Sequence, residues 1–320
     1  MPARILITGG AGFIGSHLAT RHVEMGDEVH LIVRRTPDLW RIADIRDRIS
    51  VHAIGLGDET ALARCLADAG PDYVYHLAAN ARRRPEPGFR DAFESIDEDL
   101  LDVLRLLRAA AEAPTPPQCL VQAGTLAVYG AIDTPYSEDQ RERPMTSYAA
   151  AKIAGMHYMQ MLQPRLPFRT AIGRLALVFG ADQSSTFLIP ELIRNCLVGG
   201  ASIVRRPDDR RDLLHIDDAV DALIHLASRA PAGMSLVNLA SGVAPTMREV
   251  AEHILRVSGA DPDLIEYGGG EGEPGITDLC ASTALAKKLL GWSARDHWTT
   301  GIERTVAEFR AMLASNSVAA

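Results

Sequence analysis

"RILITGGAGFIGSHL", residues 4–18, decides how the chain begins to fold. The apolar run at 5–7 predicts a strand, glycines crowd the next residues, and apolar side chains resume at helical spacing at 14 and 18. A glycine-rich turn from strand to helix gathers backbone N–H groups at the positive end of the helix dipole, which favours a phosphate. The spacing of Gly9, Gly12 and Gly15 therefore predicts a nucleotide-binding turn, although a tight turn without a ligand uses the same residues.

Composition narrows the class of protein. The chain has 320 residues, 47% of them apolar, so it can bury a large core in one or two domains. The net charge of −8 argues against nucleic-acid binding. The basic clusters at 82–84 and 205–211 do not change this, because they are short and flanked by acids and prolines. We expect a cytoplasmic protein with no membrane partner, since there is no apolar leader and no run of about 18 apolar residues. We expect no metal site, because of the spacing of the cysteines. The cysteines lack the paired spacing of zinc sites or disulfide frameworks; they are Cys65, Cys119, Cys196 and Cys280.

Strand-like runs alternate with amphipathic helical stretches up to about residue 180. This alternation predicts a parallel sheet covered by helices on both faces. Later residues read as helices, one opened by Asp217 or Asp218 as N-cap and another introduced by Thr246. The second half therefore predicts a smaller, more helical lobe, and the cleft between the lobes is the expected binding site.

The end of the second predicted strand indicates which dinucleotide is bound. NAD-preferring sites carry a carboxylate about 20 residues past the glycines, where it accepts hydrogen bonds from the adenosine ribose. Here Val33 stands at that place and Arg34 and Arg35 follow. Guanidinium groups pair with phosphate oxygens, so this end favours the 2′-phosphate of NADP. Two solvated arginines at a strand end are the alternative.

A second pattern, "SYAAAK", places Tyr148 and Lys152 one helical turn apart on the same face. An ammonium beside a phenol, together with the positive charge of a nicotinamide, would lower the phenol pKa toward a range useful for proton transfer. The pair alone is more typical of a helix surface. It becomes a site prediction because Thr125, which follows a buried strand, could hold a substrate oxygen.

The motifs "TGGAGFIGSHL", "YHLAA", "GTLAVYG", "YAAAK", "RLALVFG", "RRDLLHIDDAV" and "NLASG" resemble, in order and distance, those of the extended short-chain dehydrogenases/reductases that act largely on nucleotide sugars. The resemblance implies a Rossmann domain at 1–175, with segments near 212–240, and a substrate lobe at 176–211 and 241–320. It implies catalysis by Thr125, Tyr148 and Lys152, and substrate binding by Thr125 and Arg211. The implied cofactor site comprises Gly9, Gly12, Phe13, Ile14, Gly15, Arg34, Arg35, Leu56, Leu77, Ala78, Ala79, Tyr148 and Lys152.

Several positions depart from the pattern of that family. The Asp-Glu pair that drives dehydration is replaced by Leu126 and Ala127, so we do not expect a dehydratase. The substrate-side asparagine is Leu177, and Asp99 stands for the usual helix asparagine. A second diphosphate arginine is not evident at 271–273. Two histidines, His76 and His215, adjoin apolar strand or helix-start residues and are expected to be structural.

These residues predict an NADP-dependent enzyme that reduces the keto group of a nucleoside-diphosphate 4-keto-deoxysugar. One alternative is a nucleotide-sugar 4-epimerase that regenerates its NAD or NADP. Another is a non-catalytic NADP-sensing protein, because a fold does not fix a function. The partner expected in each case is a small molecule, and we expect a homodimer.

Overall fold

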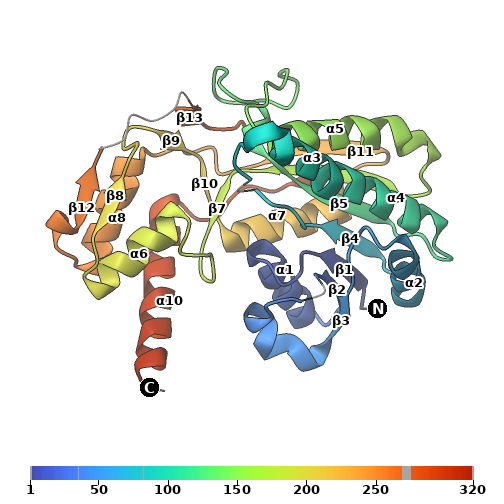
Figure 1. Cartoon of the computed structure of the whole chain (residues 1–320), viewed down its shortest axis with the longest axis horizontal. Coiled ribbons are helices and arrows are strands. Elements are labelled where there is room, and N and C mark those ends of the chain that lie inside the picture. Colours follow the sequence, from blue (N-terminus) through green and yellow to red (C-terminus); the bar gives the residue numbers. More distant parts are fainter. Residues whose placement is uncertain (1, 35, 82, 269–274, 319–320) are drawn as a thin grey trace.

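The computed structural model describes residues 2–34, 36–81, 83–268 and 275–318 (Figure 1). Seven parallel strands form the main sheet: β1 (Arg4–Thr8), β2 (Glu28–Val33), β3 (Ile49–Ala53), β4 (Tyr73–His76), β5 (Cys119–Thr125), β6 (Arg169–Leu175) and β11 (Met234–Leu239). Their spatial order is β11-β6-β5-β4-β1-β2-β3. This order confirms the predicted doubly wound Rossmann sheet.

Helices cover both faces of the sheet because alternate residues of each buried strand point to opposite sides. Ile5 and Ile7 pack with the helices α1 (Phe13–Glu24) and α7 (Ile216–Arg229). Leu6, between them, packs on the other side. The helices of that side are α2 (Glu59–Ala69), α4 (Asp102–Glu112) and α5 (Ser147–Leu162).

The position of β1 creates the binding crevice. β1 pairs with β2 on one side and with β4 on the other, so the winding of the chain reverses between β1 and β4. Ligands of open α/β sheets bind beyond the carboxyl ends of the strands at such a reversal. The glycine turn follows β1 and therefore lies at this edge.

The smaller lobe lies beside the sheet and has its own apolar core (Figure 1). It is built from α6 (Leu188–Val198), β8 (Ser202–Val204), α8 (Met247–Ser258), β12 (Ile265–Tyr267) and α10 (Trp298–Val318). The other elements are η1 (Trp40–Arg48), η2 (Pro87–Phe89), α3 (Arg90–Ser95), the π-helix η3 (Ile96–Leu101), η4 (Leu126–Val128), η5 (Gln163–Arg165), β7 (Leu177–Phe179), β9 (Arg210–Arg211), β10 (Leu213–His215), η6 (Pro262–Leu264), β13 (Asp278–Leu279) and α9 (Ala284–Leu290). The expected smaller, mostly helical lobe is confirmed.

The structure divides one apolar run in two and moves one predicted helix cap. The run at 170–180 looks continuous, yet it forms β6 in the main sheet and then β7, which pairs with β10. The N-cap of α7 is His215, which accepts a hydrogen bond from the Asp217 N–H at 3.3 Å, rather than Asp217 or Asp218. The helix thus begins two residues earlier than Asp217 as N-cap would place it, and three earlier than Asp218 would. Thr246 does cap α8, in a reciprocal capping box with Glu249.

Candidate active site

The glycine turn is shaped by close backbone contacts. Gly9 has φ +70°, and a Cβ there would lie 2.8 Å from the backbone nitrogen of Ala78. A Cβ on Gly15 would lie 2.3 Å from the carbonyl oxygen of Gly9. Helix α1 starts with Gly12 as N-cap and no side-chain hydrogen bond, so its first-turn N–H groups, at Phe13 and Ile14, are available to an anion. These residues fit the pyrophosphate of a dinucleotide.

The predicted residues after β3 and β4 lie close to this turn. Leu77 donates its N–H to the Thr8 carbonyl at 3.2 Å, and Ala78 donates to the Thr8 hydroxyl at 3.3 Å. Leu56 is buried, in a cluster against which the half-buried Ala78 packs, and Ala79 is exposed. The structure therefore brings these residues to the same end of the sheet as the glycines.

The structure describes only some of the residues that are predicted to favour NADP over NAD. Val33 is buried at the end of β2 and Arg34 follows with an exposed side chain, near the crevice end of the strand. Arg35 lies outside the described residues. An exposed guanidinium can reach a phosphate on the ligand, but the same exposure suits a solvated arginine.

The three predicted catalytic residues come from β5 and α5. Thr146 caps α5 through a hydrogen bond from the Ala149 N–H at 3.2 Å, which places Tyr148 in the first turn. The Nζ of Lys152 lies 5.6 Å from the centroid of the Tyr148 ring. Thr125 and Lys152 line one narrow internal cavity together. The Thr125 hydroxyl accepts a hydrogen bond from the Ala127 N–H at 3.1 Å, and it can still donate to a ligand.

The electrostatics of this pair differ from the sequence prediction. Burial raises the pKa of the Tyr148 phenol, and the Asp99 carboxylate raises it further. Burial lowers the pKa of the Lys152 amine, while Asp99 raises it. The protein's own groups thus do not lower the phenol pKa as predicted, because burial and a nearby anion both disfavour tyrosinate.

Arg211 lies on the side of the crevice nearer the smaller lobe, and its guanidinium donates hydrogen bonds to several acceptors. Its guanidinium donates to Asp209 at 2.7 Å and to the Ile276 carbonyl at 2.8 Å. Sequence reasoning did not single out Arg206, which contacts Asp209 at 2.8 Å and so lies beside Arg211. Both belong to the basic run at 205–211, which was the available signal. The positions 271–273 lie outside the described residues.

Positions that depart from the family pattern are apolar or buried in the structure. Leu126 is 1% exposed and so belongs to the core, whereas Leu177 is 36% exposed at the start of β7. Arg174 near the end of β6 is 2% exposed and forms an ion pair with Glu142, which the sequence did not reveal. This pair joins β6 to the loop that precedes α5.

Both histidines have structural surroundings. His76 is fully buried, its Nδ1 lies 2.8 Å from the Thr8 hydroxyl, and burial lowers its pKa to about 3. His215 caps α7, and burial lowers its pKa to about 4. Neutral, buried rings of this kind are typical of structural histidines.

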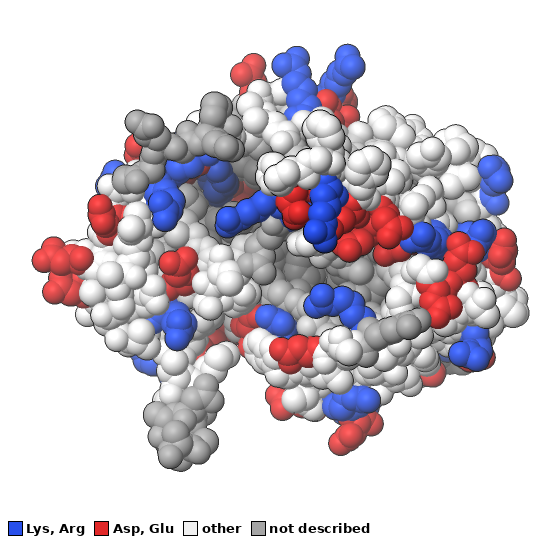
Figure 2. All heavy atoms as spheres, in the orientation of Figure 1, with Lys and Arg blue, Asp and Glu red and all other residues white. Residues whose placement is uncertain are grey.

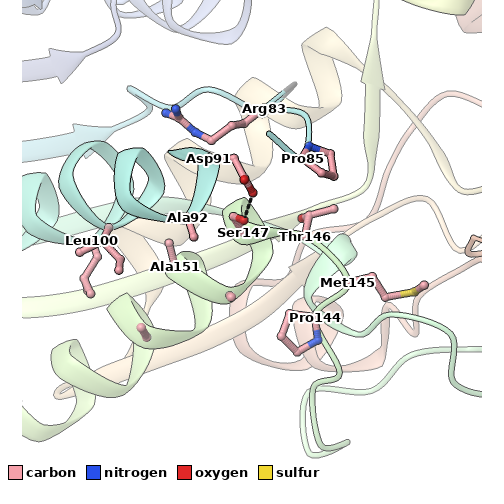
Figure 3. Close-up of a pocket in the computed structure, with 13 residues that line it drawn as sticks. Arg83, Pro85, Asp91, Ala92, Leu100, Pro144, Met145, Thr146, Ser147 and Ala151 are labelled. Carbon is pink, nitrogen blue, oxygen red and sulfur yellow. Dashed lines mark hydrogen bonds between the residues drawn. The ribbon is translucent and has the colours of Figure 1, made fainter. Parts of the chain in front are cut away.

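A larger cavity of about 600 Å³ lies between α3, η3 and the start of α5 (Figure 3). Ser147 donates a hydrogen bond to Asp91 across it, and Met145 and Pro144 line another side. None of the predicted catalytic residues lines this cavity, so the larger cavity is not the predicted catalytic site. In the space-filling view a hollow crosses one face of the molecule, with Lys and Arg side chains at its edges (Figure 2).

Fold and site together define an enzyme of the extended short-chain dehydrogenase/reductase type. The chain belongs to the NAD dependent epimerase/dehydratase family, whose model matches residues 5–240. It is 30% identical to a UDP-glucose 4-epimerase of Mycolicibacterium smegmatis, over 96% of this chain and 98% of the relative. It is 25% identical to a dTDP-6-deoxy-L-talose 4-dehydrogenase (NAD(P)(+)) of Kitasatospora kifunensis, with 92% of each covered.

Solved structures are similar over nearly the whole chain. The UDP-glucose 4-epimerase of Thermus thermophilus in complex with NAD has a TM-score of 0.84 and 25% identity, covering 96% of this chain and 99% of that one. MoeE5 in complex with UDP-glucose and NAD has a TM-score of 0.84 and 27% identity, covering 97% and 99%. Among the described residues, no helix combines the length and apolar character needed to cross a membrane.

Proposed function

We propose that the enzyme reduces the 4-keto group of a nucleoside-diphosphate deoxysugar with NADPH. The observation that carries this proposal is the end of β2, where buried Val33 and exposed Arg34 stand in place of an acidic residue. A reductase consumes one hydride per turnover and gains from a cofactor that cells keep reduced. The Kitasatospora relative, named for reaction at C4 of a deoxysugar with NAD or NADP, supports this assignment.

The proposed chemistry divides between cofactor and chain. A bound nicotinamide supplies the hydride to the sugar carbonyl carbon. Tyr148 supplies the proton to the carbonyl oxygen, Thr125 donates a hydrogen bond to that oxygen, and Lys152 stabilises the phenolate that remains. The glycine turn holds the pyrophosphate of the cofactor. Arg211 holds the diphosphate of the substrate once its guanidinium leaves part of its contact with Asp209 and Ile276.

The second candidate is a 4-epimerase, favoured by the 30% identity to the mycobacterial UDP-glucose 4-epimerase and by the NAD in the similar structures. An epimerase returns its hydride to the other face of the same sugar carbon and needs no exchangeable cofactor. The same residues would serve, with Tyr148 acting first as base and then as acid. The third possibility, a non-catalytic sensor, is disfavoured because Thr125, Tyr148 and Lys152 are all present at one site.

One experiment separates these functions. The purified protein is incubated with a 4-keto-6-deoxy sugar nucleotide and NADPH, and in parallel with UDP-glucose and NAD, while reduced nicotinamide and sugar products are followed. Loss of one NADPH per sugar reduced supports the reductase. Interconversion of UDP-glucose and its 4-epimer without net change in cofactor refutes the reductase in favour of the epimerase. Binding of NADPH without any sugar conversion would support the sensor.

We further propose that the protein is a homodimer joined through α3, η3 and the outer face of α5. Large apolar side chains are exposed there, with Phe93 at 70%, Ile96 at 46% and Met161 at 54%. Apolar patches on neighbouring helices are typical of subunit interfaces. Phe93→Asp should shift the sedimentation profile toward monomer, whereas Met25→Asp, at an equally apolar exposed site on the end of α1, should not. A wild-type monomer at all concentrations would refute the dimer.

A further inference from the structure

Two histidines face each other at the edge of the main sheet, where β3 lies beside β2 (Figure 1). The Nδ1 of His30, on β2, is 3.1 Å from the Nε2 of His52, on β3. The ring centroids are 5.4 Å apart and the ring planes differ by 19°, so the rings meet edge to edge and nearly in one plane. This is the geometry of an N–H···N hydrogen bond, in which a single hydrogen lies between two ring nitrogens.

Glu28 determines where the other hydrogen of His30 lies. Its Oε1 is 3.1 Å from the His30 Nε2, and Arg4 of β1 stands opposite Glu28 in the ladder. An ionised carboxylate only accepts hydrogen bonds, so the His30 Nε2 carries a hydrogen. In the neutral pair the His30 Nδ1 is therefore the acceptor, and the His52 Nε2–H donates to it. The pair can take up one proton with a single hydrogen still between the rings, whereas a second proton places a hydrogen on both facing nitrogens.

The edge strand has few other side-chain contacts that hold it. β3 pairs with β2 alone, and none of its five residues is buried. Ile49 and Val51 are half-buried against the core. Little apolar area is thus buried by β3, and its attachment depends more on the ladder and on side-chain pairs across it. The bond between His30 and His52 is such a pair.

Groups on α2 also act on the pair. Burial lowers the pKa of His52, and the charge of His30 lowers it further, while Asp68 of α2 opposes both effects. The Cys65 thiol of α2 is buried, and its pKa is raised to about 11, so it carries no charge at or below neutral pH. Two positive charges on the facing rings are therefore disfavoured both by burial and by each other.

The same geometry leaves no room for a metal ion between the rings. Zn²⁺ lies about 2.0–2.1 Å from an imidazole nitrogen, so two nitrogens that point at each other across the ion need about 4 Å between them. The observed 3.1 Å suits a hydrogen. In the described part of the chain, no group of three or more His, Cys, Asp or Glu is placed to hold a metal ion.

We propose that His30 and His52 form an acid-sensitive clasp: they hold β3 to β2 while one hydrogen lies between them, and they separate when both are protonated. In the unfolded chain the two histidines take up protons independently, near pH 6.5. The folded pair takes up its second proton only at lower pH, so the unfolded chain binds more protons in that range. Stability therefore falls as the pH drops below about 6.5.

The clasp has a consequence for the cofactor site that rests on the proposed function. The segment that connects β2 to β3 begins with Arg34, directly after Val33 at the end of β2. Release of β3 frees the far end of this segment, so NADPH should bind less tightly in acid. The clasp itself does not depend on the proposed function.

Nitrogen-15 NMR of the histidine rings tests the clasp in the wild-type protein. Scalar coupling between the His30 Nδ1 and the His52 Nε2 reports the shared hydrogen directly. We expect this coupling at neutral pH, and two steps of proton uptake separated by more than about one pH unit, with the coupling lost in the second step. Independent titration of the two rings, with no coupling between them, would overturn the proposal.

The variant His52→Gln keeps an amide that can donate to the His30 Nδ1 but cannot take up a proton. Unfolding in urea and hydrogen exchange of the β3 amides are measured between neutral pH and about pH 5. In the wild type, opening of β3 should become up to about tenfold more favourable per pH unit below the first step, as for uptake of one proton, and this dependence should be absent in His52→Gln. Equal pH dependence in the two proteins would refute the clasp.

The matched control is His157→Gln, which removes an exposed histidine of α5 and should follow the wild type. Other buried histidines, such as His22 and His76, are present in all three proteins, so their contribution cancels in the differences. The NMR and exchange measurements need neither cofactor nor sugar. A protein that shows the clasp but no sugar conversion would thus refute the proposed function and leave the clasp in place.

Discussion

Gly15→Ala tests whether the turn after β1 is a cofactor site held by backbone contact. Gly15 lies in the first turn of α1, where alanine is favoured over glycine by about 1 kcal/mol. Against that gain, the added Cβ would lie 2.3 Å from the Gly9 carbonyl oxygen and 2.9 Å from the Gly10 Cα. These are backbone atoms that cannot rotate away, and forced overpacking costs about 1–3 kcal/mol. We expect a net loss of stability of about 1 kcal/mol.

The larger effect should be on binding, because the clash pushes the Gly9 carbonyl and moves the N–H groups that we propose bind the cofactor pyrophosphate. We expect the Kd for NADPH or NADH to rise at least tenfold, about 1.4 kcal/mol, in a fluorescence titration. Stability is measured in parallel by urea unfolding. The matched control is Gly155→Ala in α5, whose Cβ would make an ordinary 3.5 Å contact with Val103. It should stabilise the protein by about 0.5–1 kcal/mol and leave cofactor affinity unchanged. A Gly15→Ala variant with wild-type affinity and raised stability would refute the reasoning.

Three further predictions concern the catalytic pair, the end of β2 and the cap of α8. Tyr148→Phe should keep the fold and cofactor affinity but lower turnover by about 10² or more, since it removes only the proton donor; Lys152→Met should lower both turnover and cofactor affinity. Retained activity in Tyr148→Phe would contradict the catalytic assignment. Replacing Arg34 and Arg35 together by Ser should weaken NADP binding by about 1–3 kcal/mol with little effect on NAD, and equal wild-type affinity for both cofactors would exclude this role. Thr246→Ala should cost about 1 kcal/mol in urea unfolding through loss of the α8 capping box, and an unchanged midpoint would show that the cap contributes nothing.

The sequence by itself determined the elements whose signals are local. Apolar runs and their spacing located the strands of the main sheet, because a strand buried on both faces is apolar throughout. The sequence also predicted the glycine turn and the shared face of Tyr148 and Lys152, since each depends on residues within one turn or one helix. Thr246 as a cap belongs here too, because its partner Glu249 is three residues away.

Tertiary structure decided what depends on residues distant in the chain. The break between β6 and β7 arises because β6 pairs with β5 and β11 while β7 pairs with β10. The residues of the run itself do not indicate these different pairing partners. The raised pKa of Tyr148 likewise required the fold, because it comes from burial and from the buried carboxylate of Asp99, 49 positions away in the sequence. Spacing along a helix reports which side chains share a face. Only the packed structure sets how far water is excluded from that face and which charge is buried beside it, and these two quantities determine the pKa.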